Sequence, residues 1–312
     1  MSDIPPNLSA NQFSMTQSEE AASVPICPVC HNAKWTNFAF SRAGNTIFRC
    51  RLCKIEFSYP QPSGTKLTAI YNSGYFLGGE DKIATERVAS LKRGTAKLYL
   101  DAITPFLTVG RPRLLEIGCG SGEFLAEANS RGFQVEGLEF SSHATQVANA
   151  LLGYDAVRTG SLESTFVPTN TYDVIAAFDV IEHVRDPVHS LHRLYSALKP
   201  RGIAAIVTPS LDSWSRRLLG KYWMEYKTEH MTYFSQNSLR LALKDAGFDT
   251  ILFRPNYKVL SLDYLARYFD RFPIGFISLA VRSLRRIAPS SLAHRKVEIV
   301  ASGIMAIAKR GI

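Results

Sequence analysis

The sequence predicts an α/β protein, in which a doubly wound, mainly parallel sheet is preceded by a small metal-binding ribbon. From residue 113 onward, apolar strand segments alternate with segments of helical periodicity, which is typical of such sheets. A glycine-rich turn follows the first of these strands, and four of the five cysteines form two Cys-x-x-Cys pairs near the N-terminus. A length of 312 residues allows two domains.

The N-terminal segment, residues 1–24, is predicted to be a disordered leader. It is polar, and it lacks the basic start and the apolar centre of a signal peptide. No stretch approaches about 18 uninterrupted apolar residues, so no membrane-spanning helix is expected. We therefore expect a cytoplasmic protein.

Residues 25–60 are predicted to form a zinc ribbon. Cys27 and Cys30 are followed by Cys50 and Cys53, with 19 residues between the two pairs. Disulfides are disfavoured in a reducing compartment, and this spacing is typical of four thiolates around one structural Zn²⁺. An iron centre and a redox-active dithiol pair are the alternatives.

Residues 61–112 are predicted to form a helical lid and linker. From Gly79 onward the segment has helical periodicity, with Thr95 as a polar interruption of its apolar face. That face consists of Ala84, Val88, Leu91, Leu98 and Ala102.

Residues 113–312 are predicted to form the main domain, in which strands and helices alternate. The predicted strands are 113–117, 133–139, 154–158, 171–180, 203–210, 248–254 and 297–309. The predicted helices are 122–131, 142–152, 186–199 and 235–248, the last with Ser235 as its N-cap and Gly247 as its C-cap. Such sheets bind ligands at the carboxyl ends of their strands, where the strand order reverses.

The turn after the first strand of this domain indicates the type of ligand. The strand brings Glu116 to the turn, and the glycines that follow are Gly118, Gly120 and Gly122. A pyrophosphate is disfavoured, because the third glycine comes one residue early and the carboxylates of Glu116 and Glu123 would repel an anion. S-adenosylmethionine carries an ammonium and a sulfonium group, so a carboxylate at this place would attract it.

Several segments resemble class I S-adenosylmethionine-dependent methyltransferases, in the branch that includes ubiquinone-type O-methyltransferases and sugar methyltransferases. They are LLEIGCGSGEFL, TGSLES, YDVIAAFDVIEHVRDP, LKPRGIAAIVTPS and HMTYFSQNSLRLALKDAGF, and the resemblance covers about residues 70–255. It implies a seven-stranded Rossmann-like sheet whose last strand is antiparallel. A zinc ribbon ahead of the domain also recurs in sugar and natural-product methyltransferases of this kind.

The resemblance also implies which residues contact the cofactor. They are Glu116, Gly118, Cys119, Gly120 and Gly122 at the methionine end, Glu139 and Phe140 at the ribose, Ser161 and Leu162 along the adenine, and Phe178 and Asp179 beside the cofactor. Many relatives have Asp where this chain has Ser161, which weakens the expected contact with the adenine amino group. Cys119 itself is expected to be a small filler and not a nucleophile, since no partner base is identifiable beside it.

Two histidine motifs compete for the acceptor side. Glu182-His183 follows the fourth strand, where some ubiquinone-type relatives are proposed to bind a divalent metal with neighbouring acids. The alternative is that His183 caps and packs the following helix. Glu229-His230 resembles a segment in which sugar C-methyltransferases use the histidine as a general base, and the alternative is a histidine at the start of a helix, bonded to neighbouring backbone. Tyr75 is similar to a lid tyrosine of the same enzymes, with a core role as its alternative.

A basic, helical insertion is predicted at about residues 258–292. Between Arg254 and Lys296, nine Lys and Arg residues face two Asp residues, a net charge of +7 out of +9 for the chain. Residues with helical spacing on one face are Leu262, Leu265, Phe269 and Phe272. Two interpretations remain open: a cover on the substrate side of the sheet, or a surface that meets a lipid-linked or anionic substrate at the inner face of a membrane.

Together these features predict an enzyme, a methyltransferase that uses S-adenosylmethionine and carries structural Zn²⁺. The expected acceptor is a small molecule, a sugar or a lipid-linked glycan, methylated on oxygen or carbon. The alternatives are an RNA methyltransferase that holds RNA with the ribbon and the basic segment, and a non-catalytic cofactor-binding scaffold. Nucleic acid is the less favoured partner, because the fourth strand ends in FDVIEH and not in the Asn/Asp-Pro-Pro-aromatic signature of amino methylation on bases.

Overall fold

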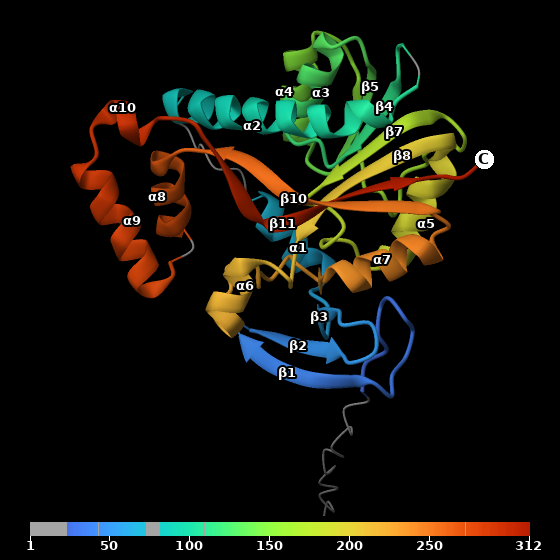
Figure 1. Ribbon diagram of the computed structural model, residues 1–312, viewed down its shortest axis with the longest axis horizontal. Coiled ribbons are helices and arrows are strands. Elements are labelled where there is room, and N and C mark those ends of the chain that lie inside the picture. Colours follow the sequence, from blue (N-terminus) through green and yellow to red (C-terminus); the bar gives the residue numbers. More distant parts are fainter. Residues whose placement is uncertain (1–23, 43, 73–81, 109, 272) are drawn as a thin grey trace, which may run out of the picture.

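The computed structural model describes residues 24–312, except for residues 43, 73–81, 109 and 272. Figure 1 shows three parts: a central sheet with helices on both faces, a small ribbon below it, and a helical hairpin that protrudes to one side. Tyr75, the expected lid tyrosine, and Phe272 of the insertion lie outside the described residues. Within the described part of the chain, no helix has both the length and the apolar character needed to cross a membrane.

The central sheet has seven strands in the order β10-β11-β8-β7-β4-β5-β6. Their bounds are β4 Arg113–Ile117, β5 Gln134–Glu139, β6 Val157–Thr159, β7 Tyr172–Phe178, β8 Leu198–Pro209, β10 Thr250–Leu260 and β11 Val297–Lys309. The last strand, β11, is antiparallel to both of its neighbours, while β4 to β8 run parallel. The predicted doubly wound, seven-stranded sheet is therefore confirmed, and its strand order reverses beside β4, where such sheets bind ligands.

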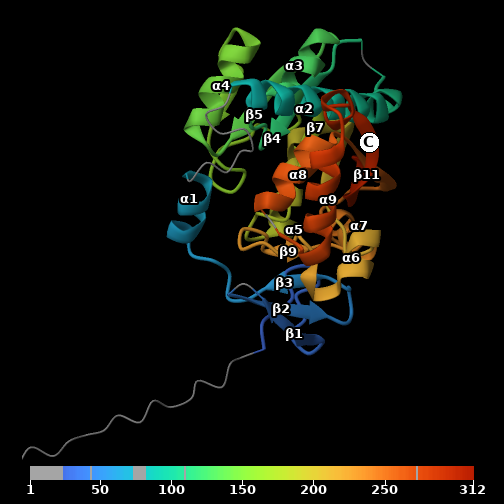
Figure 2. The ribbon, with the colours of Figure 1, turned by 90° about the vertical axis from the view of Figure 1, so that its left-hand side faces the viewer.

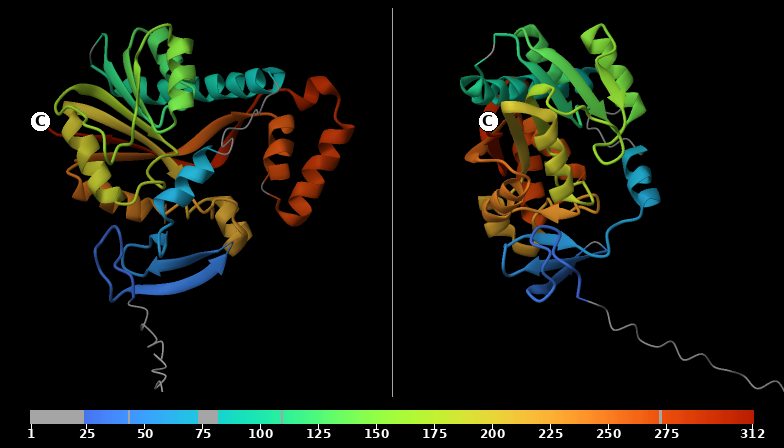
Figure 3. Two further views of the ribbon diagram at one scale, coloured as in Figure 1. Left: turned by 180° about the vertical axis from the view of Figure 1, so that it is seen from behind. Right: turned by 90° about the vertical axis from the view of Figure 1, so that its right-hand side faces the viewer.

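Helices cover both faces of this sheet. One face carries α2 (Lys82–Ile103), α3 (Glu123–Ser130) and α4 (Ser142–Leu152), and the other carries α5 (Pro187–Ala197) and α7 (Gln236–Asp245) (Figures 1 and 3). Leu114 packs in one core and Leu115 in the other, because successive side chains of a strand point to opposite faces.

Local capping residues set the ends of several helices. Ser235 and Ser238 form a reciprocal capping box at the start of α7, and the Asp186 carboxylate accepts the main-chain N–H of His189 at the start of α5. Gly247 follows the end of α7 with a φ of +103°, and the C-cap itself is Ala246, one residue earlier than predicted. Asp186, and not His183, therefore caps the helix after β7, which corrects the capping alternative for that histidine.

Two strands are longer than predicted. β8 begins at Leu198 instead of residue 203, because Leu198 already pairs with Tyr172 of β7. β10 continues to Leu260, which pairs with Val297 at the start of β11. The insertion between these last two strands consists of α8 (Leu262–Arg271), α9 (Gly275–Ile287) and α10 (Ser290–Ala293).

The N-terminal ribbon shares a sheet with the main domain. Its strands are β1 (Thr36–Arg42), β2 (Asn45–Cys50) and β3 (Glu56–Ser58), and the order β1-β2-β3-β9 adds the short strand β9 (Thr232–Tyr233) at the edge. β3 and β9 are antiparallel, with Glu56 opposite Tyr233 and Phe57 opposite Thr232. The ribbon is thus held to the loop that carries His230. The remaining elements are α1 (Gly64–Asn72), η1 (Thr104–Phe106), α6 (Trp214–Leu219) and η2 (Gly220–Tyr222).

Candidate active site

Glu116 lies buried in β4, one residue before the strand ends, beneath the glycine turn. Its side chain is 4% exposed, and its Oε2 has no hydrogen-bond partner among the described residues. Burial raises the pKa of this carboxyl well above its usual range, and the nearby carboxylates of Glu123 and Glu139 raise it further. A buried carboxylate oxygen without a partner is costly, and a bound cation would relieve that cost. The residues at this turn therefore fit the ammonium group of S-adenosylmethionine.

Glycine is required in the turn for packing as well as for backbone conformation. A Cβ on Gly118, which has a φ of +67°, would lie 2.7 Å from Cγ2 of Val180 in the loop after β7. A Cβ on Gly122, with a φ of +82°, would lie 2.9 Å from Cβ of Ala148 in α4. Gly118 thus lets the loop after β7 approach the turn. Because Gly122 has no side chain, α4 can pack closely against it.

Glu139, the last residue of β5, closes the same turn. Its Oε2 accepts the main-chain N–H of Gly120 at 2.8 Å, and its Oε1 accepts that of Ser141 at 2.9 Å. These two bonds fix the carboxylate, and each oxygen keeps a further lone pair for the hydroxyls of a ribose. Phe140 follows with half of its surface exposed, so its ring is available beside that position.

The loop after β6 lies next to Glu139. The main-chain N–H of Gly160 donates to the Glu139 carbonyl at 2.8 Å, which places the expected adenine residues on this side of the site. Ser161 is engaged locally, because its Oγ accepts the N–H of Ser164 at 3.2 Å and lies 2.8 Å from the Ser164 hydroxyl. Leu162 is buried, and its carbonyl accepts a hydrogen bond from Arg193.

Cys119 packs in the core of the sheet. A Cβ added to Gly137 on β5 would come within 2.9 Å of its Sγ. Burial raises the pKa of the thiol, and the neighbouring carboxylates of Glu116 and Glu139 act in the same direction. These surroundings suit the expected filler.

Residues at the end of β7 contact Phe124, just after the glycine turn, and Lys258, near the basic insertion. The ring of Phe178 lies between those of Tyr99 and Phe124, at centroid distances of 4.6 and 4.8 Å. Asp179 has a φ of +55°, and its Oδ2 lies 2.6 Å from Nζ of Lys258 on β10. Sequence reasoning missed Lys258 as part of the site, because it counted this residue only as one of the basic residues near the insertion.

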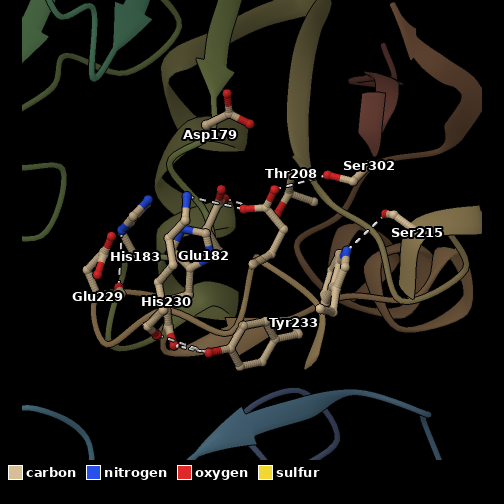
Figure 4. A network of polar contacts seen from close by, with 12 residues as sticks. Asp179, Glu182, His183, Thr208, Ser215, Glu229, His230, Tyr233 and Ser302 are labelled. Carbon is tan, nitrogen blue, oxygen red and sulfur yellow. Dashed lines mark hydrogen bonds and ion pairs between the residues drawn. The ribbon is translucent and has the colours of Figure 1, made fainter. Parts of the chain in front are cut away.

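The two histidines that compete in the sequence lie in contact in the structure. The rings of His183 and His230 meet edge to face, with centroids 4.6 Å apart. Figure 4 shows how the loop after β7 and the loop before β9 bring them together with Glu182, below Asp179. Glu229 takes part through its main chain, because its carbonyl lies 3.1 Å from Nδ1 of His183.

Burial keeps both histidines neutral. It lowers the pKa of His183 to about 4, with the charge of Lys227 acting in the same direction. It also lowers the pKa of His230 well below its usual range, helped by His183 and Lys227. His230 is 3% exposed, and its Nδ1 has no partner among the residues described. A neutral imidazole with an unpartnered nitrogen can accept a proton or bind a metal ion.

Glu182 completes this cluster. Its Oε2 accepts the hydroxyl of Thr208 at 2.9 Å, while its Oε1 has no partner among the described residues. Burial, and after it the charge of Asp179, raises the pKa of the Glu182 carboxyl. Glu182, His183 and His230 each offer one ligand atom, and these atoms lie within 4.8 Å of one another. The arrangement therefore also suits a divalent metal, with His230 added to the pair that the sequence indicated.

The four ribbon cysteines converge as their spacing predicts. Sγ of Cys27 lies 3.5 Å from Sγ of Cys53, and Sγ of Cys30 lies 3.5 Å from Sγ of Cys50. All four sulfur atoms are within 4.8 Å of one another. Four sulfur donors at this separation fit one tetrahedral metal ion.

The fold and this site identify the class of protein: it has the Rossmann-like fold of class I methyltransferases. Residues 91–252 match the family described as "Methyltransferase domain", and the chain belongs to that family. Among curated proteins, the chain is 28% identical over 130 residues to a ubiquinone biosynthesis O-methyltransferase of Rickettsia conorii, covering 40% of this chain and 45% of that protein. It is 25% identical over 186 residues to one of Rhodopseudomonas palustris, covering 53% and 73%.

Two solved structures illustrate how far the fold likeness extends. Phosphoethanolamine N-methyltransferase 2 of Haemonchus contortus, in complex with S-adenosyl-L-methionine, has a TM-score of 0.55 and 18% identity, covering 82% of this chain and 62% of that one. The [4+2]-cyclase SpnF has a TM-score of 0.50 and 16% identity, covering 81% and 99%. Likeness at this level shows the fold alone. The matches also span less than half the length of the first curated relatives, at 45%, 44% and 41%.

Proposed function

We propose that this protein transfers a methyl group from S-adenosylmethionine to an oxygen or carbon nucleophile of a small-molecule, sugar or lipid-linked glycan acceptor. The observation that carries the proposal is the buried Glu116 carboxyl at the glycine turn, whose Oε2 has no partner among the described residues, on the same edge of the sheet as the two histidines. The Glu116 carboxyl suits a cationic cofactor, and the histidine pair suits a nucleophile that must lose a proton. A cytoplasmic location remains part of the proposal.

On the cofactor side, residues of this chain bind and orient S-adenosylmethionine. Glu116 receives the ammonium group, and Glu139, fixed by Gly120 and Ser141, receives the ribose hydroxyls. When bound, the cofactor supplies an electrophilic methyl group on its sulfonium. The rings of Tyr99, Phe124 and Phe178 form an apolar wall next to the turn, which helps to keep water away.

On the acceptor side, His230 takes the proton that the nucleophile loses. Its Nδ1 is unpartnered within the described structure, so the neutral ring has a nitrogen that can accept a proton. Glu182 belongs to the same cluster, and in its ionised form it would stabilise the imidazolium that forms. His183, held by the Glu229 carbonyl, positions the His230 ring through their edge-to-face contact.

A metal-assisted variant of the same reaction is supported by the same cluster. Glu182, His183 and His230 would hold a divalent cation that lowers the pKa of an acceptor hydroxyl. In that case His230 is a ligand and not the base. The RNA alternative has no support from the family or from these relatives.

Turnover of a panel of phenolic, sugar and lipid-linked acceptors tests the proposal, with release of S-adenosylhomocysteine as the readout. We expect one acceptor class to be methylated by the wild-type protein and not by His230→Ala. The exposed control Glu86→Lys should turn over normally, because that side chain is 71% exposed on α2. Tight cofactor binding without methylation of any acceptor would support the scaffold alternative instead.

A further inference from the structure

The outward face of α9 is apolar. Phe276, Leu279, Leu284 and Ile287 expose 77%, 67%, 51% and 79% of their surfaces. Their spacing of three, five and three residues places them on one side of the helix, together with the exposed Ala280 and Ser283. The hairpin is the insertion that contains α8, α9 and α10, and Figure 2 shows its helix α9 in front of the body, on the side that faces the viewer. An exposed row of this kind differs from the scattered apolar residues of ordinary surfaces.

The inward side of the same helix is mixed, with Ile277 and Val281 partly buried beside polar residues. Nε of Arg285 lies 2.8 Å from Oδ1 of Asp263 on α8, and Ser278 is buried with its hydroxyl accepting the main-chain N–H of Ile274. A helix on the surface of a globular protein normally buries its apolar stripe and exposes its charges. In α9 a second apolar stripe stays exposed, and this stripe suits a partner outside the chain.

Positive charge borders this stripe. Arg282 and Arg286 are exposed along one edge, and Nε of Arg282 lies 2.5 Å from Oδ1 of Asp270. Across residues 262–296 there are seven Lys and Arg residues and two acidic residues, so the hairpin carries a net +5. A partner that is apolar beneath and anionic at its surface complements this pattern. A second copy of the chain does not, because packing two such faces together would bring the arginines of both copies close to one another.

The inner side of the hairpin borders the candidate active site. The ring of Tyr268 on α8 lies 5.9 Å from Nζ of Lys227, in the loop before His230. Lys258, on the strand that leads into the hairpin, holds Asp179 at the end of β7. Hence α8 lies between α9 and the site, so whatever binds the outward face of α9 is one helix away from the site.

We propose that α9 binds the surface of an anionic bilayer, with its apolar stripe in the interface and its arginines among the lipid headgroups. A helix of 13 residues lies in the interface and is too short to span, since spanning takes about 20 residues. The binding itself does not depend on the proposed activity. Its consequence, that the acceptor reaches the site from the bilayer as a lipid-linked molecule, rests on the proposed function.

Vesicle co-sedimentation of the full chain tests the proposal. We expect the wild-type protein to bind vesicles of phosphatidylglycerol and phosphatidylcholine, and to bind pure phosphatidylcholine vesicles at least about tenfold more weakly. The variant Phe276→Ser/Leu279→Ser/Ile287→Ser should lose binding to the anionic vesicles by about tenfold or more. Arg286→Glu should bind more weakly, and its remaining binding should depend less on salt.

A matched control removes equally exposed apolar residues elsewhere. Phe166→Ser/Leu218→Ser, at positions 76% and 68% exposed, should bind like the wild type. Thermal unfolding and cofactor affinity of the triple variant should be unchanged, which separates lost binding from lost folding. His230→Ala should bind vesicles normally, so failure of catalysis and failure of membrane binding are told apart. Absence of wild-type binding, equal binding by the triple variant, or a wild-type dimer that the triple substitution dissociates would overturn the proposal.

Discussion

The main-chain N–H of Ser58, in the ribbon, donates to the carbonyl of Met231, the residue after His230, at 3.0 Å. The N–H of Met231 in turn donates to the carbonyl of Glu182 at 2.8 Å, and the Tyr233 hydroxyl donates to the carbonyl of His230 at 2.8 Å. The loop with His230 is therefore clamped between the ribbon and the loop after β7. Because the clamp consists mainly of backbone hydrogen bonds, it depends on the ribbon being folded.

Loss of the ribbon metal should therefore impair catalysis more than cofactor binding. Structural zinc contributes on the order of 10–16 kcal/mol to isolated zinc fingers, so Cys30→Ser should melt residues 27–57 locally. We expect turnover to fall by at least about tenfold, because β9 loses its neighbour β3. Cofactor affinity should stay near wild type, since Glu116 and Glu139 lie on β4 and β5.

Elemental analysis and calorimetry check this prediction together. Freshly purified wild-type protein should contain about one zinc ion per chain, and Cys119→Ser, which lies outside the ribbon, should keep it. Absence of bound metal in the wild type would refute the zinc assignment. Normal turnover by the metal-free Cys30→Ser variant would refute the coupling between the ribbon and His230.

A second prediction concerns the histidine pair. Positioned bases contribute about 10²- to 10⁴-fold in rate, so His230→Ala should slow single-turnover methyl transfer by that order while cofactor affinity stays near wild type. His183→Ala should act less on the chemical step and more on stability or on metal dependence, because His183 positions the ring of His230.

A chelator distinguishes the two roles of the cluster. If Glu182, His183 and His230 hold a required cation, treatment with a chelator should stop turnover and added Mg²⁺ or Mn²⁺ should restore it. If His230 is the base, turnover should resist a chelator that is too weak to remove the ribbon zinc. Normal turnover by His230→Ala combined with an inactive His183→Ala would show that the wrong histidine has been assigned.

Cofactor binding should depend on pH through Glu116. Its pKa is raised in the free protein by burial and by Glu123 and Glu139, so the carboxyl holds a proton to a higher pH than an ordinary glutamate. A bound ammonium group favours the ionised form, and binding therefore releases a proton. Affinity should rise as the pH increases above the ordinary glutamate value of 4.5 and level off once the free carboxyl is ionised.

Calorimetry in two buffers of different ionisation enthalpy measures this proton release directly. Glu116→Gln should bind more weakly and should lose most of the pH dependence, which separates Glu116 from the other titrating groups. An affinity that falls as the pH rises would mean that the cofactor prefers the protonated carboxyl, which is the opposite of the expected proton release.

The sequence predicted those features that leave a local pattern. The strand 113–117, the helix 142–152 and the strand 297–309 have the predicted bounds, because alternation, periodicity and capping are encoded within each segment. The four cysteines converge because the members of each pair lie on one turn and the β1–β2 hairpin brings the two turns together. Their spacing alone was therefore sufficient for the prediction.

Contacts between distant loops could not be predicted in this way. His183 and His230 come from different loops, and β3 meets β9 across more than 170 residues, as in the bond from Ser58 to Met231. Neither contact has a periodic signature, since it depends on how the sheet and the ribbon pack together. The link between Lys258 and Asp179 escaped prediction for the same reason.

The central claim is that Glu116 receives a cationic cofactor, and calorimetric titration of S-adenosylmethionine tests it most directly. We predict that the wild-type protein binds one equivalent and that Glu116→Lys abolishes binding, because an ammonium group would then meet the cofactor's own. Both proteins should show the same far-ultraviolet circular dichroism, and the exposed control Glu86→Lys should bind normally. No binding by the wild type, or unchanged affinity in Glu116→Lys, would contradict the account.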